Sequence, residues 1–192
     1  MKLKKIESIL KRRKTIVLIE GTPQWIGDYQ AMYIMENLPR MDEIGLFAMF
    51  DIPKDQQSKF SVIKKHCHAH RLMAEDHCIT DNEVSYCPGL GIYCDGSVYL
   101  PIGTSQGVKF LAAEYLAPFA KENITLYERV LDGHLVFVVK AGLFIKAVIN
   151  PLVFADGGGV VKAFASSLSE QMQDYTNDLY FFTDKEGKHE NL

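Results

Sequence analysis

The chain has 192 residues, of which 47% are hydrophobic and 23% are charged, and its formal net charge is −3. This length and composition exclude a disordered chain and favour one domain with a core of its own. The small net charge excludes a global electrostatic attraction to nucleic acid or to an anionic membrane. A surface that binds a polyanion must therefore be local.

The sequence predicts a soluble, cytoplasmic protein that does not enter a membrane. Apolar runs fall short of the roughly 20 residues that span a bilayer, and the N-terminal segment lacks the apolar stretch of a signal peptide. Because cytosolic thiols are kept reduced, we expect the four cysteines to be free thiols or metal ligands rather than disulfides.

The first 14 residues are strongly basic. They hold seven of the 21 Lys and Arg residues and one acid, Glu7, so this segment carries +6 and the remainder −9. Leu3, Ile6, Ile9 and Leu10 recur at helical spacing, which predicts an amphipathic helix over residues 2–13 with a basic outer face.

The rest of the first half alternates apolar and turn-forming segments. A strand is predicted over Thr15–Ile19, a turn over Gly21–Pro23 and a second strand over Trp25–Met35. Residues 36–60 favour a further strand or a short helix around the apolar patch Leu46–Phe50.

The second half has clearer strand signals, with an Asp-Gly hairpin turn at Asp132–Gly133. A short helix is predicted over Ala112–Lys121, kinked or shortened by Pro118. The predicted strands are Val98–Ile102, Val108–Leu111, Ile124–Val130, Leu135–Val139 and Leu143–Ile149.

Together these elements predict an α+β domain of antiparallel sheets and two short helices over residues 1–155. A polar, His- and Cys-rich insertion is expected at about 54–97. The glycines at 157–159 then mark the start of a C-terminal helix and tail over residues 156–192.

The two predicted halves each run from a helix into paired strands, and the helix at residues 3–14 corresponds to the helix at residues 112–121. The segments that carry the pattern are Val108-Lys109-Phe110, Tyr115-Leu116, Ile124-Thr125-Leu126, Val136–Val139 and Leu143–Pro151. Over residues 1–35 and 98–154 this order resembles one domain of the bacterial sliding DNA clamp, whose closing strand is similar to Ala147–Leu152. Clamp chains carry two or three such domains, and this chain has room for one.

The resemblance implies a pseudo-repeated fold with helices that face a DNA-filled channel, and a non-enzymatic role in DNA replication. Double-stranded DNA, replication proteins and further copies of the chain are the partners it implies. The sequence offers these candidate DNA-binding residues: Lys4, Lys5, Lys11, Arg12, Arg13 and Lys14. The alternative is that this helix has an ordinary solvated face.

The insertion is the one place where a metal is expected. It gathers all four cysteines and four of the six histidines, and zinc takes four such ligands. The candidate ligands are His68, His77, Cys78, Cys87 and Cys94. Free thiols and exposed histidines are the alternative, and no other cofactor is expected.

Two further motifs raise alternative functions. Gly103–Gly107 matches the Gly-x-Ser-x-Gly pattern of serine hydrolases, with Ser105 as the nucleophile, although a strand rather than a helix is predicted after it. In the tail, Leu179, Tyr180, Phe181 and Phe182 resemble peptides that dock onto sliding clamps. Two alternatives follow for this tail: it binds a partner protein, or it packs on its own domain.

The sequence therefore favours a DNA-associated accessory protein over two alternatives. The first alternative is a protein-interaction or scaffold domain that binds no DNA and has a zinc-stabilised insertion. The second is a serine hydrolase.

Overall fold

A computed structural model describes residues 1–36, 38–66, 82–86, 90–94 and 96–152. The fold has both helices and strands, so the predicted α+β class is confirmed. Within the described residues, no helix is both long enough and apolar enough to cross a membrane.

The chain begins with helix α1 (Leu3–Arg13) and strand β1 (Thr15–Glu20), as the sequence predicts. The single strand predicted over Trp25–Met35 is wrong, because β2 (Trp25–Gly27) and β3 (Ala31–Ile34) form an antiparallel hairpin. Asp28 makes the turn between them, since its Oδ1 accepts hydrogen bonds from the backbone nitrogens of both Gln30 and Ala31 at 2.8 Å.

The described residues between 38 and 60 contain two short helices and no strand. Asp42 caps α2 (Glu43–Met49) by accepting a hydrogen bond from the Gly45 nitrogen, and α3 (Lys54–Gln57) follows. The next segment, β4 (Ser61–His66), pairs in parallel with β1. The predicted insertion at 54–97 therefore contains a strand of the main sheet, which the sequence did not predict.

From residue 97 on, the chain follows the predicted order of two short strands, one helix and a three-stranded meander, whereas the strands at 82–84 and 92–94 lie in the predicted insertion and were not predicted. Pro118 lies inside the helix, which is a 3-10 helix rather than an α-helix. The elements are β5 (Asn82–Val84), β6 (Ile92–Cys94), β7 (Ser97–Thr104), β8 (Gly107–Ala112), η2 (Ala113–Phe119), β9 (Thr125–Leu131), β10 (His134–Ala141) and β11 (Phe144–Ile149).

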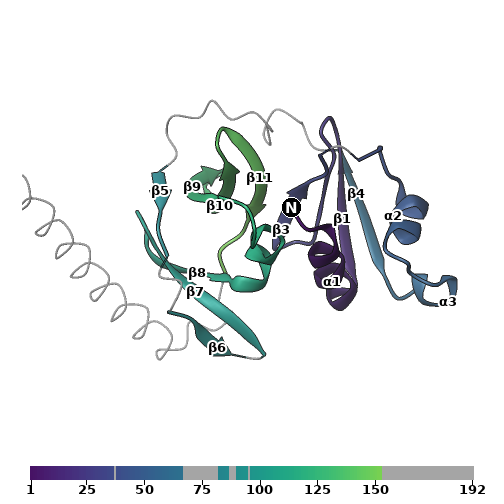
Figure 1. Cartoon of the computed structure of the whole chain (residues 1–192), viewed down its shortest axis with the longest axis horizontal. Helices are drawn as coiled ribbons and strands as arrows, with labels where there is room; N and C mark the ends of the chain where they lie inside the picture. The colour runs from purple at the N-terminus through teal and green to yellow at the C-terminus, as the bar shows by residue number, and fades with distance from the viewer. Residues whose placement is uncertain (37, 67–81, 87–89, 95, 153–192) are drawn as a thin grey trace, which may run out of the picture.

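The main sheet has a symmetric order about its central strand pair (Figure 1). Its eight strands run β4-β1-β2-β3-β11-β10-β9-β5, and β6-β7-β8 form a second sheet. The middle pair, β3 and β11, is antiparallel. On one side a helix and three strands run α1-β1-β2-β3, and on the other side they run η2-β9-β10-β11.

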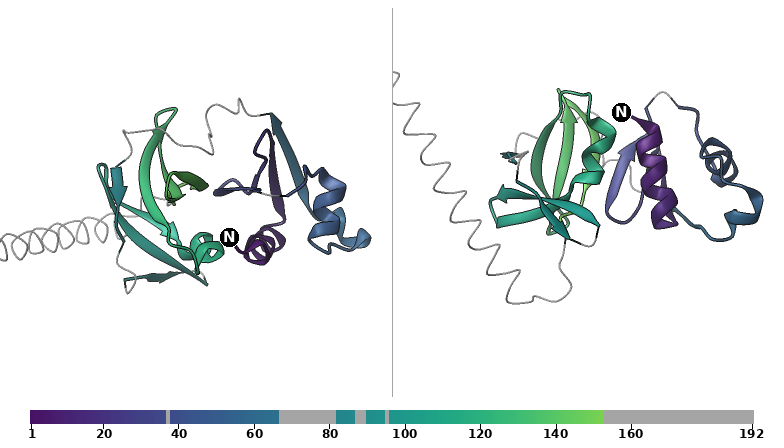
Figure 2. Two further views of the ribbon diagram at one scale, coloured as in Figure 1. Left: turned by 45° about the horizontal axis from the view of Figure 1, so that its top comes forward. Right: turned by 60° about the horizontal axis from the view of Figure 1, so that its bottom comes forward.

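Helices α1 and η2 lie side by side, as both views in Figure 2 show. The backbone nitrogen of Lys2, just before α1, donates to the Pro118 oxygen of η2 at 2.8 Å. The chain therefore brings segments more than 100 residues apart onto one surface.

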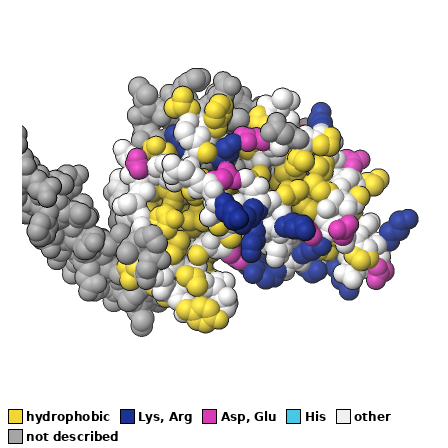
Figure 3. Space-filling model, viewed as in Figure 1, with side chains coloured by type: hydrophobic (Ala, Val, Ile, Leu, Met, Phe, Trp, Pro, Cys, Tyr) yellow, Lys and Arg dark blue, Asp and Glu magenta, His cyan; other side chains and the backbone are white. Residues whose placement is uncertain are grey.

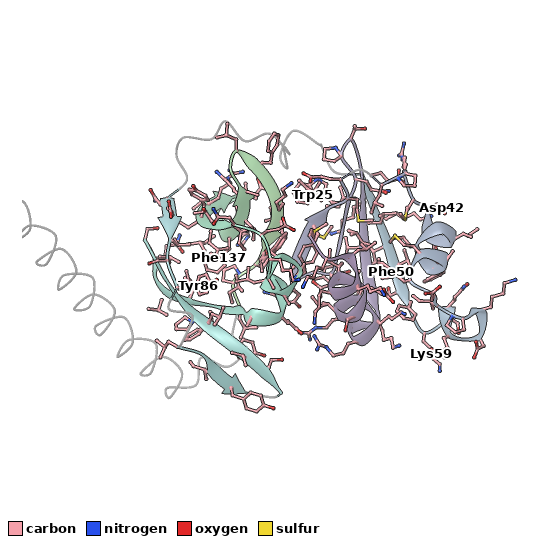
Figure 4. The ribbon with its side chains drawn as sticks, in the orientation of Figure 1. Trp25, Asp42, Phe50, Lys59, Tyr86 and Phe137 are labelled. Carbon is pink, nitrogen blue, oxygen red and sulfur yellow. The ribbon has the colours of Figure 1, made fainter. Side chains whose placement is uncertain are left out.

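Apolar side chains on the two faces of the main sheet form two clusters. One contains Ile6 and Leu10 of α1 together with Phe137, and it also contains Phe50 beside α2 (Figure 4). The other contains Val17, Trp25, Val136 and Val148 from alternate positions of the strands. Because side chains alternate along a strand, the second cluster lies on the sheet face away from α1.

Candidate nucleic-acid interface

Helix α1 is anchored by a narrow apolar stripe. Ile6, Ile9 and Leu10 are 0%, 5% and 1% exposed, and they pack into the core beneath the helix. The helix ends at Lys14, which adopts a left-handed conformation with φ of 57° and whose nitrogen donates to the Leu10 oxygen. This anchoring leaves the opposite side of the helix facing outward.

The outward side of α1 is cationic. Lys4, Lys5 and Arg12 are exposed, and Lys11 is half-buried along the same side. Lys and Arg side chains gather over the region of α1 in the space-filling view (Figure 3). The structure thus places all six predicted DNA-binding residues on or directly after one helix.

Helix stability explains only some of these charges. Lys11, Arg12 and Arg13 occupy the last turn, where cations interact favourably with the helix dipole, by about 0.3–1 kcal/mol each. Lys4 and Lys5 stand in the first turn, which holds no acid, and there cations oppose the dipole. The helix dipole therefore does not account for the two N-terminal lysines.

Four of the six predicted residues have partners within the protein. Lys11 pairs with Glu7 at 2.6 Å, and the Lys14 ammonium lies 4.6 Å from the centre of the Phe60 ring. Arg12 and Arg13 both pair with Glu114 of η2. Among the described residues, no acid pairs with Lys4 or Lys5, so these two ammonium groups are the most available to an anion.

Beneath the end of α1, a buried hydrogen-bond network joins the two halves of the fold. The Tyr115 hydroxyl donates to Asp28 Oδ2 at 3.1 Å. The Tyr33 hydroxyl donates to the backbone carbonyl oxygen of Tyr115 at 3.0 Å. Burial raises the pKa of Tyr115 to about 12, and the charge of Asp28 adds to this rise, while Arg13 lowers it by less. The network fixes η2 against the turn between β2 and β3.

A pocket of about 300 Å³ opens beside this network, between Arg13, Asp28, Tyr99 and Tyr115. Both oxygens of Asp28 already accept hydrogen bonds from the protein. Arg13 pairs with Glu114, so the fold itself accounts for both charged groups of this pocket.

The Gly-x-Ser-x-Gly motif does not form a nucleophile elbow. Ser105 and Gln106 form the hairpin turn between β7 and β8, so a strand follows Ser105 where an elbow requires a helix. The Ser105 nitrogen donates to Glu128 Oε2 at 2.8 Å. The motif therefore forms a hairpin turn that is held against β9 by Glu128.

Glu128 is itself a buried carboxylate, with 6% of its surface exposed. Burial alone would raise its pKa, but hydrogen bonds from the Asn82 side chain and from Ser105 outweigh that effect and lower the pKa below its usual value. Glu128 thus ties β5, β9 and the β7–β8 turn together.

Most of the predicted metal ligands and all of the predicted partner-binding residues lie outside the described part of the chain. His68, His77, Cys78 and Cys87 lie outside the described residues, and Cys94 is the last residue of β6. Within the described part of the chain, no group of three or more His, Cys, Asp or Glu residues could hold a metal ion. Leu179, Tyr180, Phe181 and Phe182 also lie outside it.

Sequence reasoning missed the residues that organise this surface. Glu114 lies about 100 positions along the chain from Arg12 and Arg13, and Tyr115 is similarly distant from Asp28. A local pattern could not signal these pairs, because the fold alone brings them together. No protein-family model, curated protein or solved structure matches this chain.

Proposed function

We propose that this protein is a non-enzymatic, DNA-associated accessory protein that binds duplex DNA through the outward face of α1. The observation that carries the proposal is the pair Lys4 and Lys5, which are exposed at the helix end where cations are unfavourable. Phosphate oxygens are the ligands that would make such charges favourable.

The binding would be to the DNA backbone and independent of base sequence. Lysine is a flexible point charge suited to phosphate, and α1 offers it with Lys11 and Arg12 on the same side. The overall charge of −3 limits the attraction to this one face. Affinity should therefore fall steeply with added salt.

The resemblance to a sliding-clamp domain supports the same proposal. Two helices lie side by side on one surface, and each precedes three antiparallel strands that meet at the β3–β11 pair. In a clamp, such helices face the duplex. One unit of this size cannot enclose DNA alone, so we propose a homo-oligomer whose contacts use the edge strands β4 and β5.

A double variant, Lys4→Gln with Lys5→Gln, tests the DNA-binding face. Glutamine keeps a good helix propensity and removes an unfavourable charge, so the fold should not weaken. Fluorescence anisotropy with a labelled duplex should show about tenfold weaker binding and a salt slope reduced by about 1.8.

The matched control is Lys54→Gln with Lys59→Gln. It removes the same charge from exposed positions in and just beyond α3. The control should bind DNA with nearly the wild-type salt slope. Equal losses in both variants would show that only net charge matters, and the α1 interface would be rejected.

A protein-interaction domain without DNA binding is the second candidate, and one observation favours it. Leu143 and Phe144, at the turn between β10 and β11, are 75% and 50% exposed. Adjacent exposed apolar side chains are typical of protein contacts. Duplex binding that is absent even at low salt would favour this candidate over the first.

A further inference from the structure

A groove opens on the sheet side away from α1. Its volume is about 1010 Å³, and its floor includes Val136 and Val148 of the second apolar cluster, with Leu131 and Leu152 nearby. A space of this size accommodates several side chains. It is separate from the cationic face of α1.

The rim of the groove carries more positive than negative charge. Its two cations are Lys65 of β4 and Lys109 of β8, and Asp132 is the acid among its lining residues. A ligand that combines apolar side chains with acidic ones would match both the floor and the rim.

The described part of the chain ends at this groove. Leu152 lines the groove and is fixed there, because its nitrogen donates to the Phe110 oxygen at 2.7 Å. Forty residues follow it in the sequence. Any apolar segment within them is tethered at the mouth of the groove.

One segment of that extension has the required chemistry. Residues 174–184 contain Leu179, Tyr180, Phe181 and Phe182 between three aspartates, with no Lys or Arg. We propose that this segment of the same chain docks in the groove, with its aromatic side chains on the apolar floor and its aspartates toward Lys65 and Lys109. The proposal does not rest on DNA binding.

The tether makes such docking feasible. A flexible chain of the 26 residues from Leu152 to Asp178 spans about 28 Å on average, and a helical one about 39 Å. A short tether supplies an effective concentration on the order of 1 mM. A segment that binds the groove with only moderate affinity would therefore occupy it in most molecules.

The test uses the full chain and a fluorescent synthetic peptide of residues 174–184. In the variant Phe181→Ala with Phe182→Ala, the groove should be vacated and bind the peptide. The wild-type chain should bind the same peptide at least about tenfold more weakly, because its own segment competes. Equal binding by both chains, or no binding by either, would overturn the proposal.

Two further substitutions in the Phe181/Phe182 variant locate the peptide. Lys109→Glu should weaken peptide binding severalfold, whereas Lys59→Glu, the same charge change outside the groove, should leave it unchanged. Equal effects would overturn the assignment to this groove. Light scattering that shows self-association lost in the tail variant would place the segment in a second copy, and would also overturn docking within one chain.

Discussion

Arg13 of α1 donates a hydrogen bond to Glu114 of η2, with 3.2 Å between Nη2 and Oε1. Glu114 also accepts from Arg12. One carboxylate from the second half of the chain thus holds two arginines of the proposed DNA-binding helix, and under that proposal it would compete with phosphate for both.

Replacing Glu114 with glutamine should strengthen DNA binding. The variant loses a negative charge next to the interface and releases both arginines, so duplex affinity at low salt should rise about fivefold, or ~1 kcal/mol. Folding stability should fall by less than about 1 kcal/mol, since the paired arginines are largely exposed. Anisotropy and urea denaturation measure the two effects.

The control for this substitution is Asp55→Asn, at an exposed position of α3 with the same change in net charge. It should leave DNA affinity nearly unchanged. A similar rise in both variants would mean that Glu114 acts only through net charge.

Much of this fold could be predicted from local patterns, because those patterns reflect burial. The helix at α1 follows from apolar residues at helical spacing, β9 from apolar–polar alternation, and β10 from the apolar run after the Asp132–Gly133 turn. The strand β4 could not be recognised, since Lys64 and Lys65 occupy an edge strand beside β1 and interrupt its apolar pattern.

The candidate site was predictable only as a local excess of charge. The sequence identifies the basic helix. It does not show which cations already have partners, because Glu114 and Phe60 reach the helix only through the folding of distant segments. The division of Trp25–Met35 into two strands likewise depends on one side chain, Asp28, whose carboxylate accepts hydrogen bonds from the backbone nitrogens in the turn.

Tyr115→Phe should destabilise the protein more than Tyr33→Phe. The first substitution removes a hydrogen bond to the buried carboxylate of Asp28, at a cost of about 1.5–3 kcal/mol. The second removes a neutral bond to a backbone oxygen, at a cost of about 0.5–1.5 kcal/mol. Urea unfolding at pH 7 measures both, and the reverse order would contradict the proposed role of Asp28 as the link between the halves.

Glu128→Gln should destabilise the protein at neutral pH and not in acid. The folded-state pKa of Glu128 is lowered, so its stabilising effect is present above the ordinary value of 4.5 and is lost as the pH falls through the folded-state value. At pH 7 the substitution should cost about 1–3 kcal/mol. A cost that stays constant from pH 7 to well below 4.5 would show that the charge of Glu128 has no part in it.

The most direct test of DNA binding by α1 is the affinity of the wild-type chain for duplex DNA over a range of salt concentrations. If the four cations of the outward face, Lys4, Lys5, Lys11 and Arg12, each meet a phosphate, the logarithm of the binding constant should fall against the logarithm of salt concentration with a slope of about −3.6. The slope should be the same for duplexes of unrelated sequence. Binding that does not respond to salt, or no binding at low salt, would contradict the account.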